Sequence, residues 1–141
     1  MKYRPKKVAV LGSGVMGSGI ACHLANVGME VIMLDIVTPK LSDIDSKNSF
    51  HRNKLVNSAL QKTIKSKPAP LYHKSFASRI KTGNFEDDFD KISKSDWIIE
   101  VVVENLKIKK QIFEKVDKYR KNESLVSSNT SSIPINLLAQ D

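Results

Sequence analysis

Residues Val8 to Gly17 read V-A-V-L-G-S-G-V-M-G. The first four, all apolar, predict a buried parallel strand, and the glycine pattern G-x-G-x-x-G opens a small-residue helix predicted from Val15 to Val27. Gly28 is expected to end this helix, because glycine tolerates the left-handed conformation. A second buried strand is predicted from Val31 to Leu34, ending at Asp35. Together these elements form one strand-helix-strand unit of about 30 residues.

This context makes the glycine pattern a dinucleotide fingerprint. Gly12 permits the tight turn, Gly14 lets the backbone approach a pyrophosphate, and Gly17 lets the helix pack closely on the sheet. Asp35 follows Gly17 by 18 residues, and its carboxylate is expected to accept hydrogen bonds from the adenosine ribose. Its charge would repel a 2′-phosphate, which favours NAD over NADP. The predicted NAD site consists of Gly12, Ser13, Gly14, Val15, Met16, Gly17 and Asp35. Two alternatives remain: the same glycine loop could bind a flavin, or it could be a turn that binds nothing.

Strand and helix patterns alternate along the rest of the chain, which predicts an α/β fold with a Rossmann-like, doubly wound parallel sheet in a single domain, residues 1–141. Ligands of such sheets bind beyond the carboxyl ends of the strands, where we expect Gly12, Asp35, Glu104 and Asn129. The further predicted elements are a loop from Pro39 to Asp45, one helix from Phe50 to Ile64, a break at Pro68-Ala69-Pro70, a short strand near Ile80 before a turn at Thr82-Gly83-Asn84, a short helix within Phe85 to Ile92, a strand from Asp96 to Val103, a helix from Leu106 to Tyr119, a strand from Leu125 to Ser128 and a helix from Ile135 to Ala139.

Composition places the chain among ordinary globular domains. It has 141 residues, of which 40% are hydrophobic and 27% charged, and this balance excludes collagen-like and strongly disordered classes. No apolar run reaches the roughly 20 residues of a membrane span, and the amino terminus lacks a signal peptide, so we expect a cytoplasmic protein. The single cysteine, Cys22, allows neither an internal disulfide nor a cysteine-based metal cluster, and we expect no metal.

The net charge of +8 is concentrated in one segment. Between Lys40 and Lys81 there are ten Lys or Arg residues against two acids. Such a segment attracts phosphates on nucleic acid, on a membrane or on a small ligand, or it is simply a solvated face. Aromatic residues are not interleaved with the charges as in single-strand binders, so we expect no nucleic-acid partner.

Three blocks resemble the 3-hydroxyacyl-CoA dehydrogenase family. They are residues 8–21, the run Trp97 to Leu106, and the run Ser127 to Ser132. The first block is shared by many dehydrogenases, whereas the second and third together are much more specific. The blocks occur in family order, and the resemblance spans Lys7 to about Ala139. The stretch Lys67 to Leu71 is most similar to a bacterial β-oxidation branch.

The resemblance implies an NAD-dependent oxidation of L-3-hydroxyacyl-CoA to 3-ketoacyl-CoA. It implies that Glu104 contacts the nicotinamide ribose side of the cofactor, that Lys109 is a further cofactor contact and that Asn129 lies near the nicotinamide. From the residues alone, Glu104 could equally be a solvated acid at a helix start, and Lys109 a solvated lysine.

The same resemblance implies two contacts to the acyl-CoA substrate. Ser131 is expected to bind the hydroxyl or keto oxygen of the substrate, although a cluster of short polar side chains there could merely shape a turn. Ser58 and Lys65 match the helix that contacts coenzyme A, which would give the basic segment a ligand.

The family's general base is a histidine in a His-Phe-Phe-Asn-Pro-like motif, which this sequence lacks. His23 lies on the first predicted helix, where we expect a packing role, and no partner is evident for His51 or His73. We therefore expect a carboxyl-terminally incomplete NAD-binding part, without the helical substrate and dimerisation domain, that binds cofactor but does not turn over. The complete enzyme is expected to be a homo-oligomer. A non-catalytic nucleotide-binding module and a regulatory or interaction protein on the same fold are the alternatives.

Overall fold

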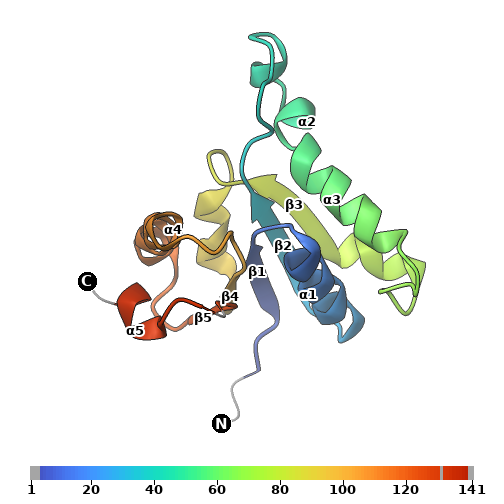
Figure 1. Ribbon diagram of the computed structural model, residues 1–141. Helices are drawn as coiled ribbons and strands as arrows, with labels where there is room; N and C mark the ends of the chain where they lie inside the picture. Colours follow the sequence, from blue (N-terminus) through green and yellow to red (C-terminus); the bar gives the residue numbers. More distant parts are fainter. Residues whose placement is uncertain (1–3, 131, 140–141) are drawn as a thin grey trace.

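The strand predicted from Val8 to Leu11 lies at the centre of the sheet. In the computed structural model, which describes residues 4–130 and 132–139, five parallel strands run in the order β3-β2-β1-β4-β5 (Figure 1). The chain moves outward from β1 and then returns to the middle, so strand order reverses between β1 and β4. This arrangement confirms the Rossmann-like, doubly wound sheet. The strands are β1 (Lys7–Leu11), β2 (Glu30–Asp35), β3 (Ile80–Asn84), β4 (Trp97–Glu100) and β5 (Leu125–Ser128).

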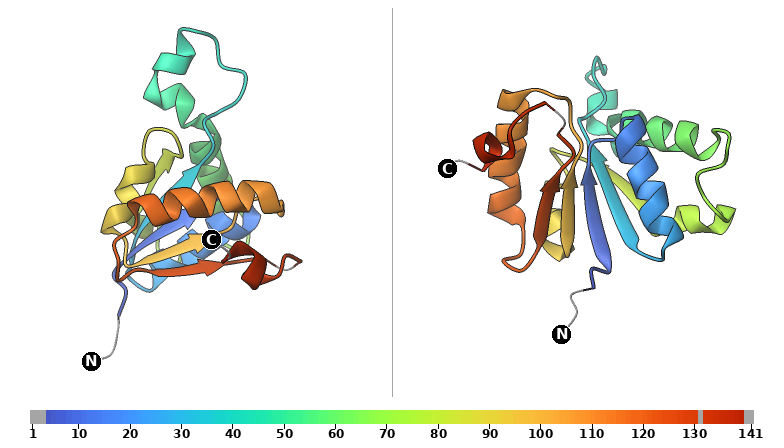
Figure 2. Two further views of the ribbon diagram at one scale, coloured as in Figure 1. Left: turned by 90° about the vertical axis from the view of Figure 1, so that its left-hand side faces the viewer. Right: turned by 60° about the horizontal axis from the view of Figure 1, so that its bottom comes forward.

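Helices cover both faces of the sheet. Figure 2 shows α1 and α3 on one face and α4 on the other. The α-helices are α1 (Val15–Asn26), α2 (Ser49–Arg52), α3 (Lys54–Ile64), α4 (Leu106–Tyr119) and α5 (Ile135–Leu138), and the 3₁₀ helices are η1 (Asp45–Lys47), η2 (Lys74–Arg79) and η3 (Phe89–Lys94). Within residues 4–130 and 132–139, none of these helices has the length and apolarity to cross a membrane.

Alternation along β1 divides the core into two. Val8 and Val10 point to the face covered by α1 and α3, where they pack with Cys22 of α1. Ala9 and Leu11 point to the opposite face, where the core is completed by η3 and α4. Because both faces are covered, β1 is a continuous apolar run rather than an alternating one.

The helix predicted from Phe50 to Ile64 is interrupted at Asn53, and this part of the prediction was wrong. Asn53 has φ −95° and ψ 6° and lies between α2 and α3. The carbonyl oxygen of Arg52 accepts from the backbone N–H and the hydroxyl of Thr38, both at 3.0 Å. The hydroxyl of Thr38 in turn accepts from the N–H of Leu55. A tertiary contact therefore takes the hydrogen bonds that a continuous helix would need.

The turn predicted at Thr82-Gly83-Asn84 was also wrong, because these residues belong to β3 and pair with β2. Gly83 serves a close approach instead: a Cβ there would lie 2.5 Å from a carboxylate oxygen of Asp88. The helix expected within Phe85 to Ile92 is the 3₁₀ helix η3, displaced to Phe89–Lys94. The strand expected to reach Val103 ends at Glu100.

Candidate functional site

The three glycines of the loop after β1 lie at the switch point and meet different surroundings. Gly12 has φ +115°, and a Cβ there would lie 2.6 Å from the carbonyl oxygen of Val101. A Cβ at Gly17 would lie 2.0 Å from the carbonyl oxygen of Gly12. A Cβ at Gly14 would meet nothing within 4 Å. Packing thus demands glycine at Gly12 and Gly17, whereas Gly14 faces open space.

Gly14 is also the N-cap of α1, and it has no side chain to satisfy the N–H groups of the first turn. Those N–H groups and the helix dipole favour an anion. The side chains of Val15 and Met16 are 89% and 57% exposed, so they leave this end of the helix accessible. Open space beside Gly14 and an uncapped helix start are what a pyrophosphate needs.

The carboxylate of Asp35 closes the cradle on the β2 side. One oxygen, Oδ2, accepts from the backbone N–H of Ser13 at 2.8 Å and from its hydroxyl at 2.5 Å. The other oxygen, Oδ1, accepts from the N–H of Ile36 at 2.7 Å. Each carboxylate oxygen can accept about two hydrogen bonds, so Oδ1 retains capacity for a ribose hydroxyl. The residues at this end of the sheet therefore fit an NAD molecule.

A second polar cluster lies at the end of β4. Lys109 of α4 is only 1% exposed, and its ammonium lies 2.8 Å from a carboxylate oxygen of Glu100, itself fully buried. The same ammonium lies 3.3 Å from Glu104, which is about one-third exposed. Lys109 therefore joins two acids at the nicotinamide end of the predicted site. Because Lys109 is buried, it is suited to hold Glu104 in position rather than to contact a ligand itself.

Glu100 was not singled out in the sequence. The available signal was its place inside the strand expected from Asp96 to Val103, because an acid buried in such a strand needs a cation. Glu104 was expected at the end of a strand. It lies instead in the loop before α4, because β4 ends at Glu100.

The loop after β5 completes this end of the sheet. The backbone N–H of Asn129 donates to the carbonyl oxygen of Glu100 at 2.9 Å, and the hydroxyl of Thr130 donates to Glu104 at 2.7 Å. Asn129 also borders an apolar groove of about 470 Å³, which runs between α1 and the strands β4 and β5 past His23 and Trp97. Ser131, the expected substrate contact, lies outside the described residues.

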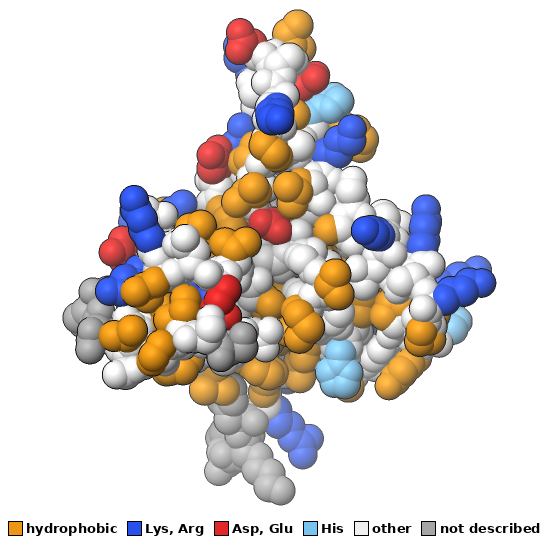
Figure 3. Space-filling model, in the orientation of Figure 1, with side chains coloured by type: hydrophobic (Ala, Val, Ile, Leu, Met, Phe, Trp, Pro, Cys, Tyr) orange, Lys and Arg blue, Asp and Glu red, His pale blue; other side chains and the backbone are white. Residues whose placement is uncertain are grey.

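The basic segment contains the two residues matched to coenzyme A. Ser58 and Lys65 are both exposed, on α3 and at its C-cap. They are two helical turns apart, so they share one side of the helix. Lys and Arg side chains gather at the right of Figure 3, over the outer end of α3 and the chain that follows it.

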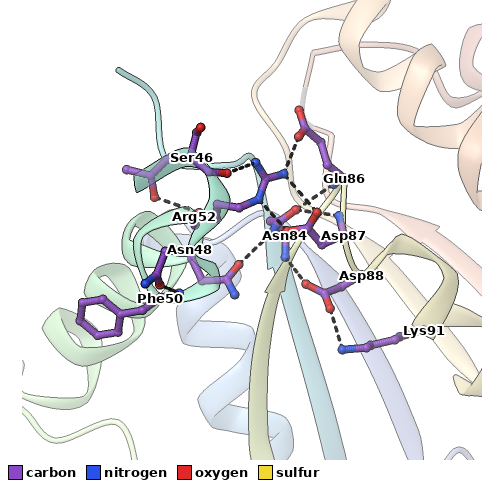
Figure 4. Close-up of polar contacts among 11 residues, drawn as sticks. Ser46, Asn48, Phe50, Arg52, Asn84, Glu86, Asp87, Asp88 and Lys91 are labelled. Atoms are coloured by element: carbon purple, nitrogen blue, oxygen red, sulfur yellow. Dashed lines mark hydrogen bonds and ion pairs between the residues drawn. The ribbon is translucent and has the colours of Figure 1, made fainter. Parts of the chain in front are cut away.

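Arg52, a basic residue of this segment, forms ion pairs within the fold. Arg52 fastens the projecting segment, residues 38–53, to the chain after β3 (Figures 1 and 4). Its guanidinium donates to Asp87 at 2.8 Å and to Glu86 at 2.7 Å. The hydrogen bonds from Arg52 and then from Asn84 lower the pKa of Asp87. Acids outside the segment thus neutralise Arg52.

The three histidines lie in different places. His23 borders the apolar groove, His51 lies 3.6 Å from Asp45 in the projecting segment, and His73 shares a hydrogen bond of 2.6 Å with Ser75. Among the residues that the structure describes, no group of three or more His, Cys, Asp or Glu side chains could hold a metal ion.

Comparison with known proteins decides the family. A family model described as "3-hydroxyacyl-CoA dehydrogenase, NAD binding domain" matches residues 7–141. The chain belongs to the 3-hydroxyacyl-CoA dehydrogenase family. It is an NAD-binding domain of that family, which confirms NAD as the cofactor.

Bacterial relatives of the family are similar over nearly the whole chain. A "Probable 3-hydroxyacyl-CoA dehydrogenase" of Bacillus subtilis is 52% identical over 96% of this chain, which covers 18% of that protein. A protein of Rickettsia felis, provisionally named a fatty acid oxidation complex trifunctional enzyme, is 40% identical over 100% of this chain and 18% of its own length. The chain therefore spans about a fifth of these relatives.

A solved structure of the family has the same architecture. The (S)-3-hydroxybutyryl-CoA dehydrogenase of Ralstonia eutropha matches with a TM-score of 0.67 and 31% identity, over 96% of this chain and 44% of its own.

Proposed function

We propose that the protein carrying this chain oxidises L-3-hydroxyacyl-CoA to 3-ketoacyl-CoA with NAD, in fatty acid β-oxidation. The observation that carries the proposal is the glycine cradle at the switch point, with Gly14 facing open space and Asp35 closing the ribose side. The family match over residues 7–141 supports the choice of reaction. We further propose that the protein acts in the cytoplasm as a homo-oligomer.

Within this proposal, the end of the sheet beyond β4 and β5 holds the nicotinamide half of the cofactor. Bound NAD would accept the hydride from C3 of the substrate. Glu104 would contact the nicotinamide ribose, Asn129 would lie near the ring, and Ser131 would bind the substrate oxygen. Lys109 would act through Glu104, because its ammonium is buried against two carboxylates.

The basic segment would bind the phosphates of coenzyme A. Ser58 and Lys65 are exposed on one side of α3, and most of the net positive charge of the chain surrounds them. A Lys65→Glu variant should weaken coenzyme A binding, and the effect should shrink as salt screens the charges over ~8–10 Å. Lys94→Glu, a lysine outside the segment, is the matched control. If Lys65→Glu binds coenzyme A with unchanged affinity, the contact must lie elsewhere on the basic segment.

We propose that the general base lies outside residues 1–141. Neither His51 nor His73 has a contact that would orient it toward the end of β5, and a positioned base typically contributes ~10²–10⁴-fold to the rate. The 141-residue chain should therefore bind NADH yet fail to oxidise it with acetoacetyl-CoA, whereas the complete protein should do both.

Binding is measured by fluorescence titration and turnover by loss of NADH absorbance. A complete protein that binds NADH without turnover would instead be a nucleotide-binding or regulatory module on this fold. Turnover by the 141-residue chain near that of the complete protein would show that a histidine within it is the base. His23, which borders the groove, would then be replaced first.

A further inference from the structure

The last residue of β4 is an acid in a place that the sheet does not require to be polar. Glu100 is fully buried, and it pairs in register with Leu11 of β1 and Ser128 of β5. A buried carboxylate is costly to desolvate unless it is paired and hydrogen-bonded. What this acid does is therefore set by the groups that surround it at the carboxyl end of β4, beside the cofactor cradle.

The carboxylate of Glu100 is fully engaged by its neighbours. Oε1 accepts from the Lys109 ammonium at 2.9 Å and from the Ser128 hydroxyl at 2.6 Å. Oε2 accepts from the same ammonium at 2.8 Å and from the backbone N–H of Val102 at 2.8 Å. These contacts fix Lys109 from α4, the start of the loop after β4 and the end of β5 around one carboxylate.

Lys109 is shared unequally between its two acids. Both oxygens of Glu100 lie within 2.9 Å of the ammonium, whereas Glu104 lies at 3.3 Å and is partly exposed. Two carboxylates around one ammonium leave one net negative charge. Because Glu100 holds the ammonium more closely and away from solvent, that charge resides mainly on Glu104.

We propose that Glu100 is a positioning residue of the NAD site: it binds Lys109 so that Glu104 keeps a negative charge toward the nicotinamide. The inference rests on the proposed function, in which Glu104 contacts the nicotinamide ribose. The ring is positively charged in NAD⁺ and neutral in NADH, so this charge favours the oxidised cofactor. Glu100 thereby tunes the relative affinity for the two redox forms without touching either.

The test uses the complete protein and the ratio of the Kd values for NAD⁺ and NADH. In Glu100→Gln, Lys109 pairs with Glu104 alone and cancels its charge. The affinity for NAD⁺ should then fall by about fivefold or more relative to the affinity for NADH, since a unit charge at short range from the nicotinamide ring is lost. A merely structural role would weaken both forms alike. Glu30→Gln is the matched control, because Glu30 pairs with Lys7 at the opposite end of the sheet, at 3.7 Å.

The double variant Glu100→Gln/Lys109→Met makes the test sharper. It removes the buried pair together and leaves Glu104 with the net charge of the original cluster. The ratio of Kd values should return toward that of the unmodified protein, although two buried residues have been replaced. A merely structural role of Glu100 predicts instead that the double variant binds both forms of the cofactor more weakly than Glu100→Gln does.

The outcomes separate the inference from the proposed function. If the unmodified protein binds neither NAD⁺ nor NADH, the proposed function fails. If it binds both and the ratio is unchanged in Glu100→Gln, only the inference is overturned. If Glu100→Gln does not fold, as thermal unfolding will show, Glu104→Gln decides, because it removes the charge itself: a ratio shifted toward NADH supports the inference, and an unmodified ratio overturns it.

Discussion

Two glycines of one motif differ in what surrounds them. A Cβ at Gly17 would collide with the backbone of Gly12 at 2.0 Å, whereas a Cβ at Gly14 would meet nothing within 4 Å. We expect Gly17→Ala to lower the free energy of unfolding by about 3 kcal/mol or more through overpacking. Gly14→Ala should fold normally and yet lose NADH affinity by at least about tenfold, because the methyl group occupies the place of the pyrophosphate.

Urea unfolding and fluorescence titration of the two variants separate these effects. Val27→Ala is the control, since Val27 is 57% exposed and lies at the C-cap of α1, the end of the helix remote from the cradle. Normal NADH binding by Gly14→Ala would mean that the pyrophosphate lies elsewhere.

Asp35 combines two roles that substitutions can separate. Its charge opposes a 2′-phosphate, and its Oδ2 atom holds Ser13 in the loop. Asp35→Asn removes the charge and keeps an acceptor, so the preference for NADH over NADPH should fall by about tenfold, equivalent to ~1.4 kcal/mol. Asp35→Ala should also weaken NADH itself, because Ser13 loses its acceptor. Titration with both cofactors measures each change, and equal affinities in the unmodified protein would refute the role.

At the scale of elements, the sequence predicted best where pattern and packing agree. The helix α4 has the predicted bounds, Leu106 to Tyr119, because its apolar positions recur at helical spacing. The break at Asn53 could not be predicted, since it depends on Thr38, a residue distant in the sequence. Likewise, Gly83 was interpreted as a turn glycine because the approach of Asp88 is visible only in three dimensions.

The candidate site divides in the same way. The cradle follows from local sequence, because the glycine pattern, the preceding strand and Asp35 are close along the chain. The cluster around Glu100 does not, because its lysine comes from the next helix and its hydroxyl from the next strand. Only the folded sheet brings these three groups together.

The projecting segment, residues 38–53, depends on Arg52 for its position against the sheet. Arg52→Met removes the contacts to Glu86 and Asp87, so backbone amides of the segment should exchange hydrogen faster. Amides of β1 should be unaffected, because the core does not involve this contact. Hydrogen exchange with mass spectrometry measures both regions. Lys54→Met, one exposed cation further along, is the control, and equal protection in both variants would show that Arg52 does not fasten the segment.

At the scale of the whole molecule, Asp96 joins the starts of three strands. Its Oδ2 atom accepts from the backbone N–H groups of Lys6 and Lys7, at 2.9 and 3.0 Å, and its other oxygen pairs with Lys121. The ion pair with Lys121 and then these backbone N–H groups lower the pKa of Asp96 to about 2. An unfolded Asp has a pKa of about 3.9, so the stabilisation is present above pH ~4 and is lost as the pH falls toward 2.

Asp96→Asn should therefore unfold at lower urea concentration than the unmodified chain at pH 7. The difference should shrink steadily below pH 4, because the carboxyl becomes protonated in both states. Asp117→Asn, at an exposed carboxylate of α4, should show little difference at either pH. A difference for Asp96→Asn that persists undiminished near pH 2 would contradict the assignment.

Burial of the single cysteine makes its labelling rate a measure of how often α1 opens. Cys22 is fully enclosed in the core between α1 and the sheet, and burial raises the pKa of its thiol, so a thiol reagent can react only when α1 opens. The labelling rate of the native chain therefore counts these openings directly. Saturating NADH should lower the labelling rate of Cys22 by the factor 1 + [NADH]/Kd, because the cofactor binds at the amino-terminal end of the same helix and stabilises its closed state. Labelling at an unchanged rate would mean that the cofactor is held without securing α1.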